Sequence, residues 1–171
     1  MKVYRVGPET ERMRLRAPEI EDADAFYRLN RDPQVTRYTG EPALASLDEA
    51  REAIATYPDF DTVGFGRWSC LSKDNGTYLG FCGLKYLEDL DEVDVGFRFL
   101  PEFWGQGLAT EACVASLQFG LEVIGLERII ALVLPDNLAS IRVVEKSGMT
   151  AAGPVDYTGL RPEKFVIEAS P

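Results

Sequence analysis

The chain has 171 residues, of which 46% are hydrophobic, and a formal net charge of −10. Its length fits a single domain over residues 1–171, and no apolar run approaches the roughly 20 residues that span a bilayer. The acidic balance disfavours binding to nucleic acid, whose phosphates it would repel. The chain contains no histidine, which excludes catalysis by a Ser-His-Asp triad. A cytoplasmic protein is the default expectation.

The first half of the chain predicts strands and helices of ordinary length. Apolar and charged residues alternate over residues 12–16, which is typical of a half-buried strand. Pro18 then opens a helix with an acidic first turn. Ser46 and Glu49 have the spacing of a capping box, which predicts a second helix running to about Tyr57.

The second half predicts further strands and two more helices. A helix is expected over residues 108–122, closed by Gly125, and another from Asn137 to Gly148. Residues 93–134 thus form a strand–helix–strand unit. The remaining strands are expected at residues 66–71, 78–87, 93–99, 128–134 and 163–169. The fold class is therefore mixed α/β, with an α+β type of sheet.

The cysteines are three in number and widely spaced: Cys70, Cys82 and Cys113. This pattern fits neither a disulfide framework nor a zinc site. Each lies among apolar neighbours, so we expect three buried side chains and no bound metal.

The chemistry-bearing segment is the turn between the strand at 93–99 and the helix at 108–122. Gly105 and Gly107 allow the backbone to approach a ligand closely. The N–H groups at the start of a helix carry partial positive charge, so the turn predicts an anion site suited to pyrophosphate. No Gly-Lys-Ser/Thr follows and a three-glycine spacing is missing, which argues against a P-loop and a Rossmann fingerprint.

The whole string from Trp104 to Ala112 resembles the GNAT acetyltransferase superfamily, and within it the RimJ/RimL-like branch. Gly107 and Ala109 match the last two positions of the superfamily's pyrophosphate motif, while Trp104 departs from its Gln/Arg position. The segments at 12–23 and 137–149 also resemble those of the branch. The resemblance covers about residues 12 to 168.

This resemblance implies a fold with splayed central parallel strands and flanking helices, with acetyl-CoA lying between the strands. It needs no metal. Backbone groups of Phe97, Arg98 and Phe99 would pair with the pantetheine arm, and Asn137 would bind it as well as cap its helix. The pyrophosphate would be held by the amides of Gly105, Gln106, Gly107, Leu108, Ala109 and Thr110.

The implied reaction is acetyl transfer to a primary amine by direct attack in a ternary complex. Asp94 is the expected base, with Glu92 or water as alternatives. Many relatives carry, at the position of Val144, a tyrosine that acts as the general acid. Because this chain lacks it, Ser140 becomes the candidate acid. Ser140 is also expected to bind the acetyl donor. Ser140 also fits a local helix role. Two other hydroxyls expected on the acceptor side belong to Tyr38 and Tyr157.

The partners that follow are acetyl-CoA and an amine acceptor, either a protein N-terminus or a small molecule. A homodimer is possible within such a family, and neither nucleic acid nor membrane is expected. Two other functions stay open: a catalytically silent acyl-CoA-binding regulatory domain, and a nucleotide-binding module that uses the same turn.

Overall fold

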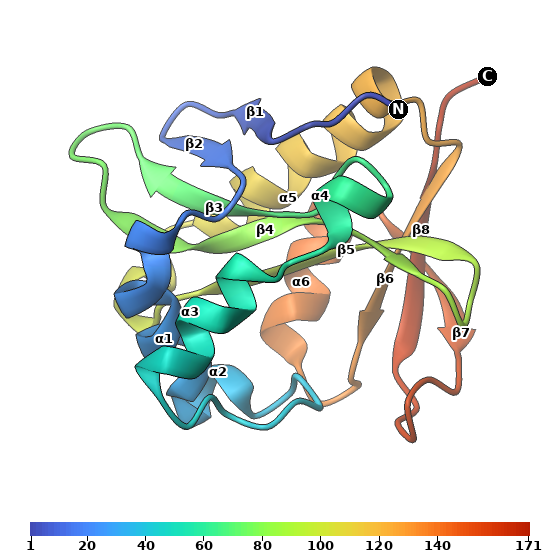
Figure 1. The fold of residues 1–171 in the computed structure, drawn as a ribbon. Coiled ribbons are helices and arrows are strands. Elements are labelled where there is room, and N and C mark those ends of the chain that lie inside the picture. The colour runs from blue at the N-terminus through green and yellow to red at the C-terminus, as the bar shows by residue number, and fades with distance from the viewer.

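The computed structural model describes all 171 residues, and its centre is one mixed sheet (Figure 1). The sheet has eight strands in the order β1-β2-β3-β4-β5-β6-β8-β7. All neighbours pair antiparallel except β5 and β6. The strands are β1 (Val6–Glu9), β2 (Met13–Arg16), β3 (Arg67–Ser72), β4 (Tyr78–Leu87), β5 (Glu92–Phe99), β6 (Arg128–Val133), β7 (Thr150–Pro154) and β8 (Glu163–Glu168).

Helices cover both faces of the sheet. Figure 1 shows α1 and α3 in front of it, with α5 and α6 behind. None of the helices is both long enough and apolar enough to span a membrane. The α-helices are α1 (Ala23–Arg31), α2 (Pro33–Thr36), α3 (Leu47–Ala55), α4 (Asp59–Thr62), α5 (Leu108–Gln118) and α6 (Leu138–Lys146). Short 3-10 turns occupy Ile20–Asp22 and Pro101–Phe103, and a π-helix follows α5 at Phe119–Ile124.

The parallel pair β5–β6 is splayed, as the family resemblance implied. The two strands share one paired position, Asp94 with Ile130. By contrast, β5 pairs with β4 from Glu92 to Phe99. Because β6 leaves β5 so early, most of one edge of β5 has no strand beside it, and the sheet opens into a V (Figure 1). The prediction of a mixed α/β fold with splayed central strands is confirmed.

Local capping signals placed the helix starts well. The Ser46 hydroxyl accepts from the backbone N–H of Glu49 at 3.1 Å, as a capping box requires. The Glu49 carboxylate reaches the N–H of Ala45 at 2.7 Å rather than that of Ser46. The predicted helix at 108–122 is helical throughout, although its last turns are π-helical before Gly125 closes it with a φ of +83°.

Two strands were not placed by the sequence, and both lie at the sheet margins. β1 reads Val-Gly-Pro-Glu and β7 reads Thr-Ala-Ala-Gly-Pro. Glycine and proline weaken a strand signal, yet they are tolerated at edges because one side needs no ladder partner. Gly7 has a second role, because a Cβ there would lie 2.7 Å from the Trp68 ring.

The main core lies between the sheet and helices α5 and α6. Trp68 is fully buried in it, and its indole N–H donates to the carbonyl of Tyr4 at 2.8 Å. Cys70, Cys82 and Cys113 are all buried and unpaired, as predicted. Burial raises the pKa of the Cys113 thiol to about 11, which argues against a thiolate nucleophile.

A buried carboxylate ties the first helix to the sheet. Asp22 accepts two hydrogen bonds from Arg16, at 2.8 and 3.0 Å, and one from Ser69 at 2.8 Å. Burial acts to raise the pKa of Asp22, but the bonds from Arg16, Ser69 and the backbone of Glu19 outweigh it, so the pKa is lowered.

We expect Asp22→Asn to destabilise the fold by roughly 2–3 kcal/mol at pH 7, because it removes charge-assisted bonds to Arg16. A carboxyl with a lowered pKa in the folded state stabilises above its unfolded pKa, and this contribution is lost as the pH falls below about 4. Urea denaturation from pH 7 to pH 3 measures it. The wild type should lose more stability on acidification than Asp22→Asn, and parallel losses would contradict the assignment.

Candidate active site

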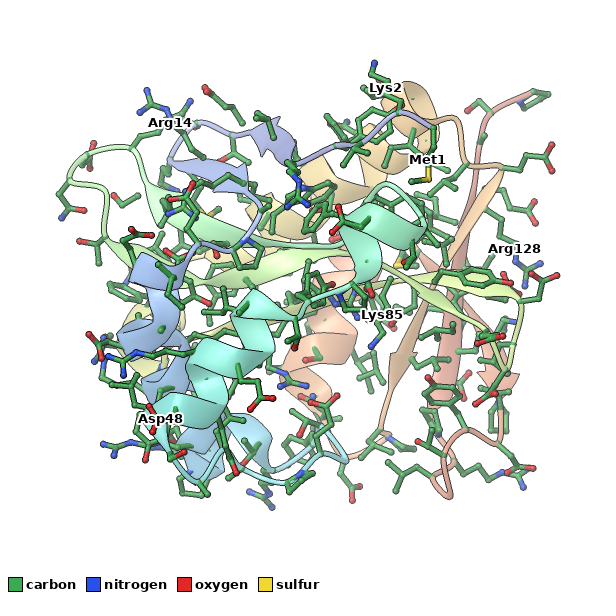
Figure 2. The ribbon with its side chains drawn as sticks, in the orientation of Figure 1. Met1, Lys2, Arg14, Asp48, Lys85 and Arg128 are labelled. Carbon is green, nitrogen blue, oxygen red and sulfur yellow. The ribbon has the colours of Figure 1, made fainter.

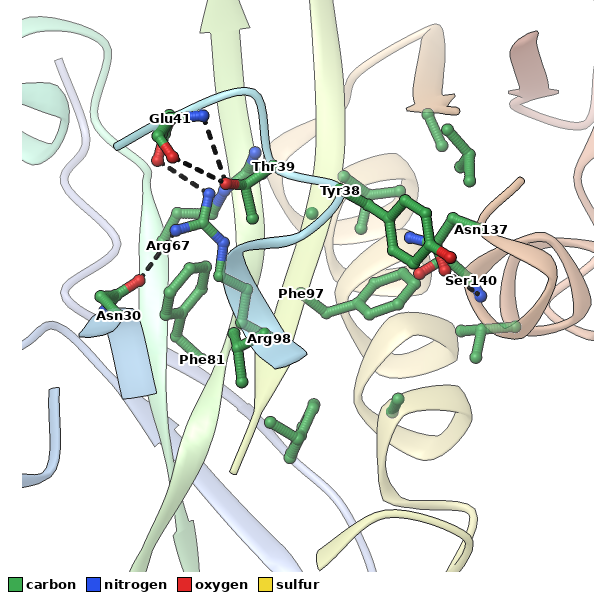
Figure 3. Close-up of a pocket in the computed structure, with 18 of the residues that line it drawn as sticks. Asn30, Tyr38, Thr39, Glu41, Arg67, Phe81, Phe97, Arg98, Asn137 and Ser140 are labelled. Atoms are coloured by element: carbon green, nitrogen blue, oxygen red, sulfur yellow. Dashed lines mark hydrogen bonds and ion pairs between the residues drawn. The ribbon is translucent and has the colours of Figure 1, made fainter. Parts of the chain in front are cut away.

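A cavity of about 1240 Å³ occupies the V between β5 and β6. Its lining includes residues of the turn before α5, of α6, of the segment after α2 and of the loop between β7 and β8. Figure 3 shows labelled side chains from the segment after α2, from β5 and from the start of α6 around this space. The cavity therefore joins the predicted donor region to a second region that can hold another molecule.

The turn before α5 has the backbone geometry that its glycines suggested. Gly107 is the N-cap of α5 with a φ of +78°, and no side chain caps this helix end. Gly105 also has a positive φ, of +74°. The first N–H groups of the helix are thus left for a ligand. Gln106 does not line the cavity, unlike the other predicted residues of the turn: Gly105, Gly107, Leu108, Ala109 and Thr110.

Residues from the β1–β2 region hold this turn in place. Arg12 donates to the carbonyl of Gln106 at 3.0 Å and pairs with Glu111 at 2.9 Å. Thr10 donates to the same carboxylate at 2.6 Å. Burial acts to raise the pKa of Glu111, but the bonds from Thr10 and Arg12 lower it overall. These contacts hold the turn at Gln106 and at Glu111, on either side of Gly107.

Strand β5 offers backbone groups on its open edge at alternate residues. The N–H of Leu100 donates to the carbonyl of Leu79 in β4. In an antiparallel ladder the hydrogen-bonded positions alternate, so the backbone groups of Arg98 also face β4, and those of Phe97 and Phe99 face the V. By this alternation the N–H and carbonyl of Arg98 point to Phe81 in β4, so Phe97 and Phe99 are the members of the predicted set whose backbone groups face the V. Their contact with the donor stays a prediction.

The side chain of Trp104 hydrogen-bonds one backbone group on this open edge. Its indole N–H donates to the carbonyl of Phe99 at 2.7 Å, while the side chain stays 46% exposed. The carbonyl of Phe99 is therefore occupied, and the N–H of Phe99 is the group left for a ligand. Trp104, which departs from the Gln/Arg position of the superfamily motif, thus ties the turn to the end of β5.

Asn137 and Ser140 meet at the start of α6. The Asn137 side-chain oxygen accepts from the N–H of Ser140 at 3.3 Å, which confirms the N-cap. Both residues line the cavity, whereas Val144 is fully buried. In Figure 3 the ring of Tyr38 points toward these two residues. A hydroxyl from the segment after α2 thus faces the helix where the family's tyrosine is missing.

Asp94 lines the cavity, and its carboxylate already forms an ion pair with Arg67. Its Oδ1 lies 2.9 Å from Nη2 of Arg67, and both side chains are largely buried, with 11% and 20% exposed. Arg67 also donates to the carbonyl of Gly83 at 2.7 Å. A Cβ on Gly96 would lie 2.5 Å from the Arg67 guanidinium. Glu92, the alternative base, does not line the cavity and pairs with Arg128 and Lys164.

Arg67 is the site residue that the sequence interpretation missed. It lies 27 positions before Asp94 and belongs to no motif of the resemblance. One signal was present: Gly96 interrupts an alternating strand, and a glycine inside a strand often marks a close approach by another group. The guanidinium of Arg67 is that group.

Tyr157, from the β7–β8 loop, adds a second phenol to the cavity lining. Burial raises the pKa of Tyr157, and the charges of Asp94 and Asp89 raise it further. The phenol of Tyr157 therefore carries its proton at neutral pH.

The cavity is basic although the chain is acidic. Two acidic side chains line it, Glu41 and Asp94, and each is paired with an arginine. Lys85, labelled in Figure 2, is an exposed residue of β4 that lines this cavity. The basic lining residues are Arg37, Arg67, Lys85, Arg98, Arg142 and Lys146. The lining therefore carries more positive than negative charge, which favours an anionic ligand.

The site thus combines a V-shaped sheet, a helix start without a side-chain cap and a cavity lined by more basic than acidic side chains. Residues 12–150 match the family model described as "Acetyltransferase (GNAT) domain". The chain belongs to this family, and it is an acetyltransferase.

Relatives by sequence support the same assignment. The chain is 30% identical to the uncharacterized N-acetyltransferase p20 of Bacillus licheniformis over 146 residues, which cover 84% of this chain and 82% of that protein. It is 36% identical to the uncharacterized protein YkkB of Bacillus subtilis, with 82% and 83% covered.

Solved structures support the fold. An acetyltransferase from Agrobacterium tumefaciens aligns with a TM-score of 0.81 at 22% identity, covering 94% and 92% of the two chains. A spermidine N-acetyltransferase from Vibrio cholerae, solved with CoA and spermine, gives 0.75 at 19%, covering 91% and 95%. RimL, a ribosomal L7/L12 acetyltransferase in complex with CoA, gives 0.78 at 17%, covering 96% and 98%. The RimJ/RimL-like branch stays a prediction at this identity.

Proposed function

We propose that this enzyme transfers the acetyl group of acetyl-CoA to a primary amine by direct attack in a ternary complex. The observation that carries the proposal is the single cavity that joins the N-terminus of α5 to the region around Asp94. Two substrates can be bound there at once, so no covalent enzyme intermediate is needed. A cytoplasmic location and a homodimer remain predictions.

The donor end supports acetyl-CoA. The N–H groups of α5 are arranged for a pyrophosphate, and the open edge at Phe97 and Phe99 can hydrogen-bond an extended pantetheine arm. Both spermidine N-acetyltransferase and RimL were solved with CoA. In the proposed complex the N–H of Phe99 is the candidate donor to the thioester carbonyl, because the ladder register turns it toward the V.

The reaction forms a C–N bond between the amine and the acetyl carbon and breaks the C–S bond. The attacking nitrogen must lose one proton, and the departing thiolate must gain one. The basic lining supports the first step, since nearby positive charges lower the pKa of a bound ammonium and favour its neutral form. Asp94, directly or through water, is then the proposed acceptor of the proton.

The proton for the thiolate has three candidate sources around the cavity. Ser140 lies on α6 beside Asn137, but a serine hydroxyl is a poor acid. Tyr38 and Tyr157 are phenols on the opposite side, and Figure 3 shows Tyr38 pointing toward Ser140. We propose Ser140 as a hydrogen-bond partner of the sulfur or of a water, with a tyrosine as the proton source.

The acceptor is proposed as an amine, either a small molecule or a protein N-terminus. The names of the structural neighbours span both kinds, since one acts on spermidine and another on a ribosomal protein. The cavity of this chain holds no carboxylate that is free of an arginine. A polycation therefore has weak electrostatic support here, although acidic residues are frequent elsewhere on the chain.

The test is turnover. Purified enzyme with acetyl-CoA should release CoA, detected by a thiol reagent, when the correct amine is present in a panel of amino acids, peptides, polyamines and aminoglycosides. Acetyl-CoA should also raise the melting temperature, and ATP and NAD should not. Stabilisation by acetyl-CoA without CoA release across the panel would contradict catalysis and favour a silent binding domain.

A further inference from the structure

Lys85 is a basic residue of the cavity lining that has no partner within the chain. Most lysines and arginines of this acidic protein pair with a carboxylate, and Lys2, Arg31 and Arg37 lie over aromatic rings. The residues that do neither are Lys85, Arg142 and Lys146, and all of them line the cavity. Lys85 is the one among them that belongs to the sheet, in β4.

Lys85 stands directly opposite the candidate base. In the ladder between β4 and β5 its partner position is Asp94. Opposite residues of an antiparallel pair project to the same face of the sheet, with their Cβ atoms about 5 Å apart. No ion pair joins the two residues, because Asp94 pairs with Arg67 instead, at 2.9 Å. The ammonium of Lys85 is therefore unpaired on the sheet face that carries Asp94.

The acidic lining residues are balanced without Lys85. Arg67 pairs with Asp94, and Arg98 pairs with Glu41 at 2.8 Å. Arg98 and Asp94 are four residues apart in β5, so their side chains project to the same face of the sheet. Lys85 is exposed and lines the cavity. Its positive charge is therefore surplus to these pairs and available to a bound molecule.

Lys85 and Asp94 together match a molecule that carries both an amine and a carboxylate. Arg67 donates to Oδ1 of Asp94, and no group of the chain donates to Oδ2, which leaves this oxygen for an amine. In an α- or β-amino acid the carboxylate is attached to the carbon that bears the amine or to the next one. The flexible four-carbon stem of Lys85 can reach a carboxylate held so close to Asp94. A polyamine would bring a second positive charge toward Lys85 and be repelled.

We propose that Lys85 binds the carboxylate of the acceptor, and that the acceptor is an α- or β-amino acid whose amine lies at Asp94. This rests on the proposed function and narrows its acceptor from any primary amine to one with an adjacent carboxylate. The hydrogen bond from an ammonium to a carboxylate is charge-assisted. Because the carboxylate takes no part in the reaction, Lys85 should lower KM and leave kcat unchanged.

Acetylation of amino acids and of their amides tests the proposal. The probes are the common α-amino acids, β-alanine and the C-terminal amide of each, which keeps the amine and loses the negative charge. CoA release is measured with saturating acetyl-CoA. Lys85→Gln should raise KM for the acids about tenfold, with kcat unchanged, and should leave both constants unchanged for the amides. Comparing the two enzymes on each pair cancels the difference in amine pKa between acid and amide.

Two further variants serve as controls. Lys85→Arg keeps the charge and should keep most of the wild-type preference for the acids. Lys73→Gln makes the same replacement in the turn after β3, at a residue that does not line the cavity, and should behave as the wild type does. Lys85→Gln should also keep the wild-type melting temperature and acetyl-CoA affinity, because Lys85 has no partner in the fold.

The outcomes separate this subsite from the proposed function. Equal losses for acid and amide in Lys85→Gln, or no loss for either, would overturn the role of Lys85. Acetylation of amides, peptides or polyamines without acetylation of any amino acid would overturn the proposed acceptor and leave acetyl transfer to an amine standing. Absence of CoA release with every amine would overturn the proposed function itself, and the subsite with it.

Discussion

Replacement of Gly107 by valine is expected to abolish acetyl-CoA binding while the fold stays intact. Gly107 has a φ of +78°, a conformation that a β-branched residue avoids at a cost of roughly 1–3 kcal/mol. A valine would therefore shift the backbone and turn the first N–H groups of α5 away from the pyrophosphate. Losing two or more charge-assisted bonds weakens binding by roughly 100-fold or more. Calorimetry with acetyl-CoA measures the loss.

The control variant Gly125→Val separates a loss of acetyl-CoA affinity from a loss of stability. Gly125 has a φ of +83°, close to the +78° of Gly107, and a Cβ on Gly125 would meet no atom within 4 Å. It ends the helix that Gly107 begins, and it does not line the cavity. Both valine variants should lower the melting temperature by similar amounts, and only Gly107→Val should lose acetyl-CoA. Unchanged affinity in Gly107→Val would remove the pyrophosphate from this turn.

Features set by neighbouring residues could be predicted from the sequence. The cap at Asn137 and the positive φ of Gly125 and Gly148 each follow from the needs of one helix end. The strand–helix–strand unit followed from periodicity. Periodicity did not predict the splay of β5 from β6, because the sequence of either strand is compatible with longer pairing. Only the family resemblance implied the splay.

Features set by distant residues could not be predicted. The bond from Trp104 to the carbonyl of Phe99 depends on how the turn folds back, and it decides which backbone group is left for a ligand. The family resemblance implied that backbone groups of Arg98 contact the donor, but the ladder register turns them toward β4. Arg67 reaches Asp94 across the sheet. Such contacts depend on register and rotamer, which composition does not encode.

Asp94 has two candidate roles: it is the base of the reaction, or it only holds Arg67 through their ion pair. Substitution of Asp94 distinguishes the two roles. If Asp94 is the base, Asp94→Asn should lower kcat by about 10²–10⁴ near neutral pH. The deficit should shrink as the pH rises toward the pKa of the free amine, because solvent then removes the proton. If Asp94 only holds Arg67, the deficit should be the same at every pH. A pH–rate profile with saturating substrates measures this.

Stability must be measured beside the rate, because removal of one member of a buried ion pair costs roughly 3–5 kcal/mol. Asp94→Asn and Arg67→Met should each destabilise the fold, and the double variant should recover part of the loss because no charge is left unpaired. Its rate should not recover if Asp94 accepts the proton, since the carboxylate is still missing. A double variant that regains both stability and rate would show that the pair is structural. The proton would then pass to water in a cavity whose positive charges already favour the neutral amine.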